Sequence, residues 1–261
     1  MVDAHTILNS KIEINKRVVN GQIKWYGPVL MVFARPLLAL LSQGLVISLF
    51  IALKRSSDAY PVTAWWTVYS TLVDIGCLLF LFFLLKREGI KLFDLVSFDR
   101  SKLSTDLLIG LGILVIIFPL TIGIGSNLAS ILVYGSLKPD LPPGSFIRIL
   151  PLWAVLYSRL IWWIIWSATE ELTYNAYALP RLQILTGKTW IAVLGVGFGW
   201  ALQHSFLPFI NVNHAIWLLI TFFPLTIAIQ LVYLKYRRLF PLIIGHWAMD
   251  FFSVVFMLKV G

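Results

Sequence analysis

Long apolar stretches recur along the chain from residue 29 to residue 258. A helix needs about 20 apolar residues to cross the hydrocarbon core of a bilayer. Seven stretches are long enough, at about 29–53, 64–85, 107–134, 149–182, 189–210, 215–234 and 239–258. The pattern predicts an all-α protein, a polytopic transmembrane helical bundle with about seven (seven to eight) membrane spans.

The same pattern sets the expected domain boundaries. Residues 1–27 are polar and mixed in charge, and the apolar stretch that follows is too long for a signal peptide, so it is interpreted as a retained span. We expect a cytoplasmic N-terminal segment at 1–27 and a single transmembrane domain at 28–261. The third stretch carries Pro119, Gly123 and Gly125 and is expected to be tilted, kinked or split.

Composition excludes several classes of protein. The chain is 59% hydrophobic and only 13% charged, whereas soluble domains have about 25% charged residues. Soluble globular enzymes, disordered chains and nucleic-acid modules are therefore excluded. The single cysteine, Cys77, lies in an apolar stretch and is interpreted as a packing residue.

Basic residues are distributed unequally between the segments that connect the predicted spans. Lys and Arg number 21 against 12 Asp and Glu, which gives a net charge of +9. Fourteen of these basic residues fall on the side that holds the N-terminus and five on the other. Because positive residues favour the cytoplasmic side, we expect a multi-pass protein of a prokaryotic-type cell membrane with a cytoplasmic N-terminus. The lipid bilayer is the expected partner of this charge, and no nucleic acid is expected.

Ionisable side chains inside the apolar stretches need a reason to be there, because each costs about 2.5–3.5 kcal/mol at mid-membrane on insertion scales. The chain has eight of them: Arg35, Asp74, Arg159, Glu170, Glu171, His204, His246 and Asp250. We interpret Arg35 and Asp74 as a structural pair or as side chains that reach the interface, and Arg159 as a residue of the outer interface. His5 and His214 fall in a tail and a loop and are expected to be solvated.

The other five groups lie on three predicted spans. Glu170 and Glu171 are adjacent, so on a helix they point about 100° apart and only one of them easily faces a given cavity. The other needs a local partner, and Asn175 lies four residues from Glu171 on the same face. His246 and Asp250 are also four residues apart, so the carboxylate can orient the imidazole.

Depth in the membrane supports grouping these residues. At 1.5 Å per residue, Glu170, His246 and Asp250 lie about 16, 12 and 18 Å from the nearest cytoplasmic basic residue, and His204 lies about 24 Å away. The middle of a core about 30 Å thick lies near 15 Å. A fourth span centred on 149–168 would instead put both glutamates at the interface. The coincidence of depths favours the first placement.

The chemistry of these groups favours peptide hydrolysis. A carboxylate beside an imidazole in an apolar cavity can activate water, and a second histidine can stabilise the oxyanion of an amide under attack. Two histidines and two carboxylates could also hold zinc. The H-E-x-x-H, G-x-S-x-G and G-x-G-D motifs of other proteases are absent from the chain. We expect hydrolysis without a metal or cofactor, in a cavity that opens toward the cytoplasm.

The order and spacing of the residues resemble the CAAX protease and bacteriocin-processing family, which includes the type II CAAX prenyl endopeptidases. Three motifs carry the resemblance: the adjacent Glu170 and Glu171, Trp200 with His204 four residues later, and His246 with Asp250 four residues later. The resemblance extends over about 159–256. It implies a family core at about 149–258.

The resemblance also implies roles for the residues. Glu170 would act as the base on water with His204 as its helper, while His246 and Asp250 would line the oxyanion side and Glu171 would support the site. All five are candidate catalytic residues. The implied activity is that of an intramembrane glutamate endopeptidase that cleaves a membrane-embedded or lipidated peptide or protein.

One departure from the family pattern motivates an alternative function. Asn175 stands where the first family motif ends in arginine, so the cation that would neutralise Glu171 is missing. Arg159 or another cation would have to replace it, or Glu171 would be protonated, or the site would be degenerate. A degenerate member would act as a scaffold or assembly subunit with a partner in a membrane-protein complex. A small transporter or proton relay is disfavoured, because the sequence shows no inverted repeat.

Overall fold

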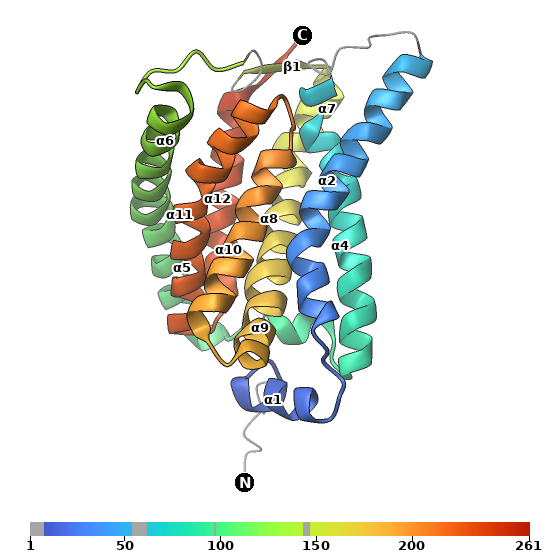
Figure 1. The fold of residues 1–261 in the computed structure, drawn as a ribbon, viewed down its shortest axis with the longest axis vertical. Coiled ribbons are helices and arrows are strands. Elements are labelled where there is room, and N and C mark those ends of the chain that lie inside the picture. Colours follow the sequence, from blue (N-terminus) through green and yellow to red (C-terminus); the bar gives the residue numbers. More distant parts are fainter. Residues whose placement is uncertain (1–7, 54–61, 97, 143–146) are drawn as a thin grey trace.

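The computed structural model describes residues 8–53, 62–96, 98–142 and 147–261. Most helices run along the long axis of a single bundle, with the N-terminus at one end and the C-terminus at the other (Figure 1). The predicted all-α class is confirmed.

The helices and strands follow the apolar stretches closely. The α-helices are α1 (Lys11–Val19), α2 (Tyr26–Ala52), α4 (Trp66–Glu88), α5 (Leu103–Gly112), α6 (Phe118–Tyr134), α7 (Leu152–Tyr157), α8 (Trp163–Glu171), α9 (Leu179–Thr186), α10 (Thr189–Phe206), α11 (Val212–Tyr236) and α12 (Phe240–Met257). Short 3₁₀ turns occur at Leu92–Leu95 and Arg100–Lys102. Strands β1 (Arg148–Leu150) and β2 (Leu258–Val260) pair in parallel, with Arg148 opposite Leu258.

Three π-helical segments join consecutive α-helices into longer rods. One segment, Ile113–Ile117, connects α5 to α6 directly before Pro119, where the sequence predicted an irregularity. The other two, Ser158–Trp162 and Leu172–Ala178, join α7, α8 and α9. Because π-helical turns are rare and frequently occur at functional sites, the second rod is a natural place to look for such a site.

Among the described residues, five helices are long and apolar enough to cross a membrane, at Tyr26–Ala52, Trp66–Glu88, Leu92–Tyr134, Val212–Tyr236 and Phe240–Met257. The predicted number of seven spans is therefore not confirmed. The rod from α7 to α9 and helix α10 are the other two predicted spans, and they carry the acidic, amide and imidazole side chains of the sequence motifs.

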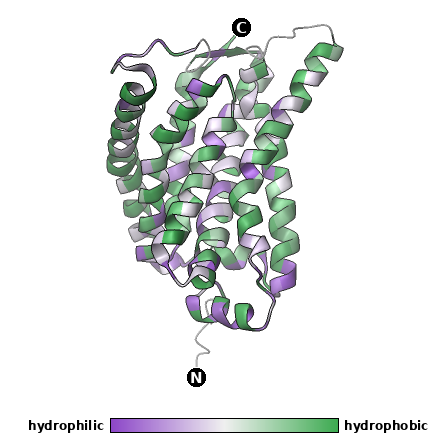
Figure 2. Ribbon diagram, viewed as in Figure 1, coloured by the Kyte–Doolittle hydropathy of each residue, from purple (hydrophilic) through white to green (hydrophobic). Residues whose placement is uncertain are grey.

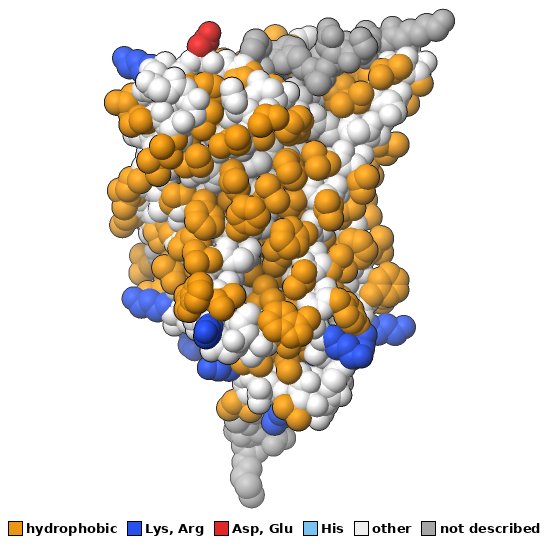
Figure 3. Space-filling model, viewed as in Figure 1, with side chains coloured by type: hydrophobic (Ala, Val, Ile, Leu, Met, Phe, Trp, Pro, Cys, Tyr) orange, Lys and Arg blue, Asp and Glu red, His pale blue; other side chains and the backbone are white. Residues whose placement is uncertain are grey.

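The surface has the character expected of a membrane protein. Hydrophobic side chains cover the middle of the molecule, and most Lys and Arg side chains in view gather at the end near the N-terminus (Figures 2 and 3). A bilayer core solvates such an apolar belt, and anionic headgroups attract the basic end. The chain is an integral membrane protein, and a cytoplasmic N-terminus remains a prediction.

Glycines allow two pairs of helices to approach closely. A Cβ atom on Gly125 of α6 would lie 2.2 Å from the carbonyl oxygen of Thr221 on α11. A Cβ atom on Gly199 of α10 would lie 2.6 Å from the carbonyl oxygen of Val32 on α2. Helices in membranes commonly pack through such small residues, and the second contact brings α2 against the helix that carries Trp200 and His204.

A buried ionic cluster closes the end of the bundle near the N-terminus. The guanidinium of Arg181 on α9 is fully buried and donates to both carboxylate oxygens of Glu88, at 2.8 and 2.5 Å. Arg17 of α1 lies 3.7 Å from Glu88, and Asn9 accepts a hydrogen bond from Arg181. Burial lowers the pKa of Arg17 from its ordinary value, an effect that Glu88 opposes. The cluster therefore holds α1 against the bundle.

We predict that Glu88→Gln destabilises the protein strongly. The substitution leaves the buried Arg181 guanidinium without its carboxylate, and breaking a buried ion pair from one side costs about 3–5 kcal/mol. The measurement is the unfolding midpoint of the protein in nanodiscs. Glu13→Gln is the matched control, because the ion pair of Glu13 among the described residues is with Lys16, whose side chain is 63% exposed, and exposed pairs contribute about 0–1 kcal/mol. Equal midpoints for the two variants would contradict this account of the cluster.

Candidate active site

The three sequence motifs converge inside the bundle. Glu170, at the end of α8, is fully buried. Trp200 on α10 donates from Nε1 to Glu170 Oε2 at 2.6 Å, and Gln203 on the same helix donates from Nε2 to Oε1. The first carboxylate is thus oriented by two donors from a neighbouring helix.

The imidazole of His246, on α12, lies among three carboxylates. Its Nδ1 is 3.0 Å from Glu171 Oε1, and its Nε2 is 3.6 Å from Glu170 Oε2 and 3.6 Å from Asp250 Oδ2. The two nitrogens of one ring point in different directions, so His246 contacts both adjacent glutamates although these diverge on their own helix. Asp250 also accepts a hydrogen bond from Ser167 at 2.6 Å.

Glu171 has the partner that the sequence predicted. Asn175 donates from Nδ2 to Glu171 Oε2 at 2.7 Å, which confirms the pairing four residues apart. Arg159 does not replace the missing arginine of the motif, because its guanidinium donates to two backbone carbonyls near the end of α12, at 3.1 and 2.7 Å. His246 occupies the position beside Glu171 instead.

Arg35 links Glu170 to a second buried carboxylate. It donates to Asp74 at 2.9 Å and to Gln203 Oε1, and its Nη2 lies 3.7 Å from Glu170 Oε1. Its guanidinium also lies 4.1 Å from the ring centroid of Trp166, a cation–π contact. The predicted Arg35–Asp74 pair is confirmed. Arg35 also places a positive charge beside Glu170, which the sequence did not predict.

His204 has different contacts from His246. Its ring stacks on Phe222 with the centroids 3.9 Å apart. Within the part of the chain that the structure describes, His204 forms no hydrogen bond or ion pair with Glu170. A water molecule or a substrate group would have to lie between the two residues for them to act together.

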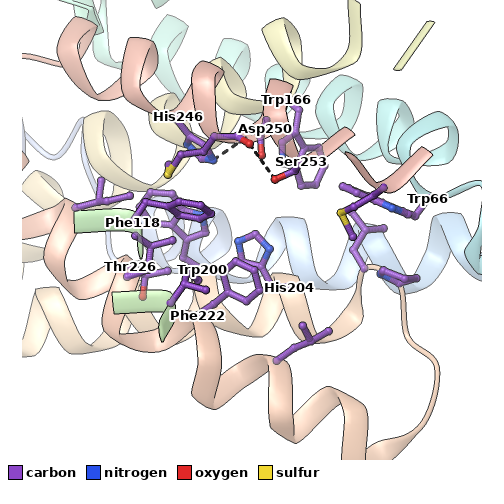
Figure 4. A pocket seen from close by; sticks show the side chains of 18 of the residues that line it. Trp66, Phe118, Trp166, Trp200, His204, Phe222, Thr226, His246, Asp250 and Ser253 are labelled. Carbon is purple, nitrogen blue, oxygen red and sulfur yellow. Dashed lines mark hydrogen bonds and ion pairs between the residues drawn. The ribbon is translucent and has the colours of Figure 1, made fainter. Parts of the chain in front are cut away.

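A cavity of about 190 Å³ lies beside these residues. His246 and Asp250 face it from α12, and Trp200 and His204 face it from α10 (Figure 4). Glu170 is not among its lining residues. It lies behind His246 and Trp200, which line the cavity and contact the Glu170 carboxylate. At this end the cavity therefore presents the imidazoles of His204 and His246 and the carboxylate of Asp250 directly, and the Glu170 carboxylate lies one layer behind.

The cavity extends toward the end of the bundle that carries β1. It is lined there by Arg148 of β1, Pro208 after α10, His214 in the first turn of α11 and Met257 at the end of α12. This end lies opposite the N-terminus (Figure 1). At the end near the N-terminus, α1 and its ionic cluster lie between the helices, and the expectation that the cavity opens toward the cytoplasm stays a prediction.

His214 is also placed differently from the prediction. It is 2% exposed and stacks on Trp217, with ring centroids 5.9 Å apart. The expectation of a solvated loop was wrong because α11 begins at Val212, so His214 faces the bundle from the first helical turn. His5 lies outside the described residues.

The arrangement suits proton transfer and the binding of a polar group in an apolar wall. Carboxylate–imidazole contacts of this kind orient the imidazole and stabilise its charged form when it accepts a proton. Among the described residues, no group of three or more His, Cys, Asp or Glu side chains has the arrangement of a metal site. The sequence missed Arg35, Trp200 and Gln203 as direct contacts of Glu170, although Trp200 and Gln203 flank the recognised histidine.

One comparison with known proteins identifies the segment that carries the site. Residues 151–252 match the family model described as type II CAAX prenyl endopeptidase Rce1-like, a segment shorter than half of the 261 residues. No curated protein and no solved structure matches the chain significantly. The matched segment begins just before α7 and ends within α12, and it contains all five candidate residues. The resemblance found in the sequence is confirmed, because residues 151–252 of this membrane protein are similar to the type II CAAX prenyl endopeptidase Rce1-like family.

Proposed function

We propose that the protein is an intramembrane glutamate endopeptidase whose catalytic residues are Glu170, Glu171, His204, His246 and Asp250. The family match supports a CAAX-protease-like membrane endopeptidase. The finer mechanism rests on one observation, which is the gathering of three carboxylates around the His246 imidazole at the inner end of a cavity that His204 also lines.

Glu170 is the proton acceptor in this proposal. Hydrolysis requires the oxygen of water to add to the peptide carbonyl carbon while a base removes a proton from that water. The donors Trp200 and Gln203 fix the Glu170 carboxylate one layer behind the cavity wall, in contact with the lining residue His246. His204, whose ring nitrogens have no hydrogen-bond partner among the described residues, also lines the cavity and holds the same water.

His246 acts on the carbonyl oxygen. It presents an imidazole to the cavity, and hydrogen-bond donors aimed at a developing oxyanion are among the largest contributions to acyl-transfer catalysis. Glu171 and Asp250 orient this ring through the contacts at 3.0 and 3.6 Å. When the C–N bond breaks, the proton taken up by Glu170 passes to the leaving amine, which balances the reaction.

The alternative function, a degenerate member that acts as a scaffold, was suggested by a glutamate without a compensating group, and the contacts of Glu171 remove that reason. Asn175 in place of arginine implied a glutamate without a compensating group, but Asn175 and His246 both contact Glu171. A cation, Arg35, also lies 3.7 Å from Glu170. The proposed substrate is a membrane-embedded or lipidated peptide or protein, because a site enclosed by apolar helices is reached most easily from within the bilayer.

We predict that Glu170→Gln lowers kcat at least about 100-fold, the contribution expected of a general base. The amide keeps nearly the same shape but cannot accept the proton of water. The assay follows cleavage of a lipidated peptide by the purified protein in nanodiscs. Glu13→Gln, which changes a glutamate of α1 outside the site, should keep wild-type kcat. Wild-type kcat in Glu170→Gln would refute the assigned base.

The two histidines should separate into different phenotypes. His246→Ala removes a partner of buried Glu171, so we expect loss of activity together with a loss of stability of about 3 kcal/mol or more. His204→Ala breaks no hydrogen bond among the described residues and loses only the stack on Phe222, about 1 kcal/mol. It should nevertheless lower kcat about 100-fold.

The measurements are kcat on the same peptide and the unfolding midpoint in nanodiscs. Normal kcat in His204→Ala would remove His204 from the mechanism. An unchanged midpoint in His246→Ala would show that the contacts around this imidazole contribute little to the fold.

A further inference from the structure

Arg35 of α2 is a buried cation to which the proposed reaction assigns no part. Its side chain is fully buried, and it is not among the residues that line the cavity. Trp166 does line the cavity, and its ring centroid lies 4.1 Å from the Arg35 guanidinium. Arg35 therefore has no direct access to a substrate in the cavity, and any effect on the reaction passes through the residues that it contacts.

The two oxygens of the Glu170 carboxylate have different surroundings. Oε2 accepts a hydrogen bond from Trp200 at 2.6 Å and lies 3.6 Å from His246 Nε2, and both of these residues line the cavity. Oε1 accepts a hydrogen bond from Gln203 and lies 3.7 Å from Arg35 Nη2. The carboxylate therefore turns one oxygen toward the wall of the cavity and is held by the other from behind.

Arg35 determines which way the Gln203 amide faces. A guanidinium carries only donors, so Arg35 Nε, which donates to Gln203 Oε1, needs the amide oxygen on its own side. The Tyr174 hydroxyl donates to the same oxygen at 3.3 Å. The amide nitrogen is thereby left to donate to Glu170. An amide turned the other way would set its oxygen against the carboxylate and lose this hydrogen bond.

The Arg35 guanidinium also lies between two carboxylates. It donates from Nη1 to Asp74 at 2.9 Å, while Nη2 faces Glu170 and has no hydrogen-bond partner within the part of the chain that the structure describes. Opposite charges attract one another more strongly in a protein interior than in water. The guanidinium therefore stabilises the negative charge that Glu170 needs in order to accept a proton from water.

We propose that Arg35 is a positioning residue for the general base, and that it acts on Glu170 both by its charge and through the Gln203 amide. This inference rests on the proposed endopeptidase function and deepens it. Arg35 lies outside the segment 151–252 that matches the family model. The cation beside the base is therefore supplied by α2, ahead of the segment that carries the sequence motifs.

Arg35→Gln should lower kcat about 10-fold or more, the loss expected when an interaction with a charged group is removed. KM should keep its wild-type value, because Arg35 does not touch the substrate. Arg35→Lys should keep more of the activity, since the charge remains. The assay is cleavage of the lipidated peptide by the full-length protein in nanodiscs. Unchanged kcat in Arg35→Gln would overturn the proposal.

Two double variants separate this role from a loss of stability. Arg35→Gln alone leaves the buried Asp74 without its cation, whereas Arg35→Gln/Asp74→Asn removes both charges and should show the same loss of kcat. Arg181→Gln/Glu88→Gln is the matched control, because it removes an equally buried ion pair outside the site. It should keep wild-type kcat once the rate is referred to the folded fraction. Equal losses in both double variants would assign Arg35 to the fold alone and overturn the proposal.

The same substitutions are also made in the Glu170→Gln background. Because no charge then remains at position 170, Arg35→Gln/Asp74→Asn should not lower the residual kcat any further. A further fall by the factor seen with Glu170 intact would show that Arg35 does not act through this carboxylate, and the proposal would be wrong.

Infrared difference spectra test the role of Arg35 without proteolysis. Subtracting the spectrum of Glu170→Gln from that of the wild type isolates the stretching band of the Glu170 carboxyl group. We expect the band of an ionised carboxylate in the wild type, and a shift toward that of a protonated carboxyl in Arg35→Gln/Asp74→Asn. This shift in a protein that cleaves no peptide would support the role of Arg35 although the proposed function had failed. An unshifted band would overturn the role of Arg35, even where cleavage by the wild type is normal.

Discussion

The neutralisation of ionisable side chains inside an apolar bundle is the constraint on which this structure depends. A buried charge that lacks a partner is costly in a protein interior and more so within lipid. Two connected clusters meet this constraint. In one cluster, Arg35 contacts Asp74 directly, and Gln203 links Arg35 to Glu170. In the other, His246 contacts Glu171 and Asp250.

These clusters also explain how the helices are arranged. Their members come from α2, α4, α8, α10 and α12, so each contact fixes one helix against another. The close approach of α2 and α10 at Gly199 is needed for Arg35 to reach Gln203. Polar contacts of this kind specify one packing among the many that apolar surfaces would allow.

The two ends of the bundle are built differently. At the N-terminal end, α1 and the pair of Arg181 with Glu88 fill the space between the helices. At the opposite end, the short strand pair of β1 and β2 borders the cavity and brings Arg148 into its wall. Access to the site is therefore decided by connecting segments rather than by the helices that hold the carboxylates.

The sequence by itself determined the helical class, the apolar elements, the ionisable residues of interest and the pairing of Glu171 with Asn175, because these depend on hydropathy and on the local period of a helix. Only the tertiary structure decided which histidine meets the glutamates, that Arg35 approaches Glu170, and that the cavity runs toward β1. The physical reason is that spacing along a helix fixes which residues share a face, whereas the rotation and depth of one helix against another are set by packing that no single segment encodes.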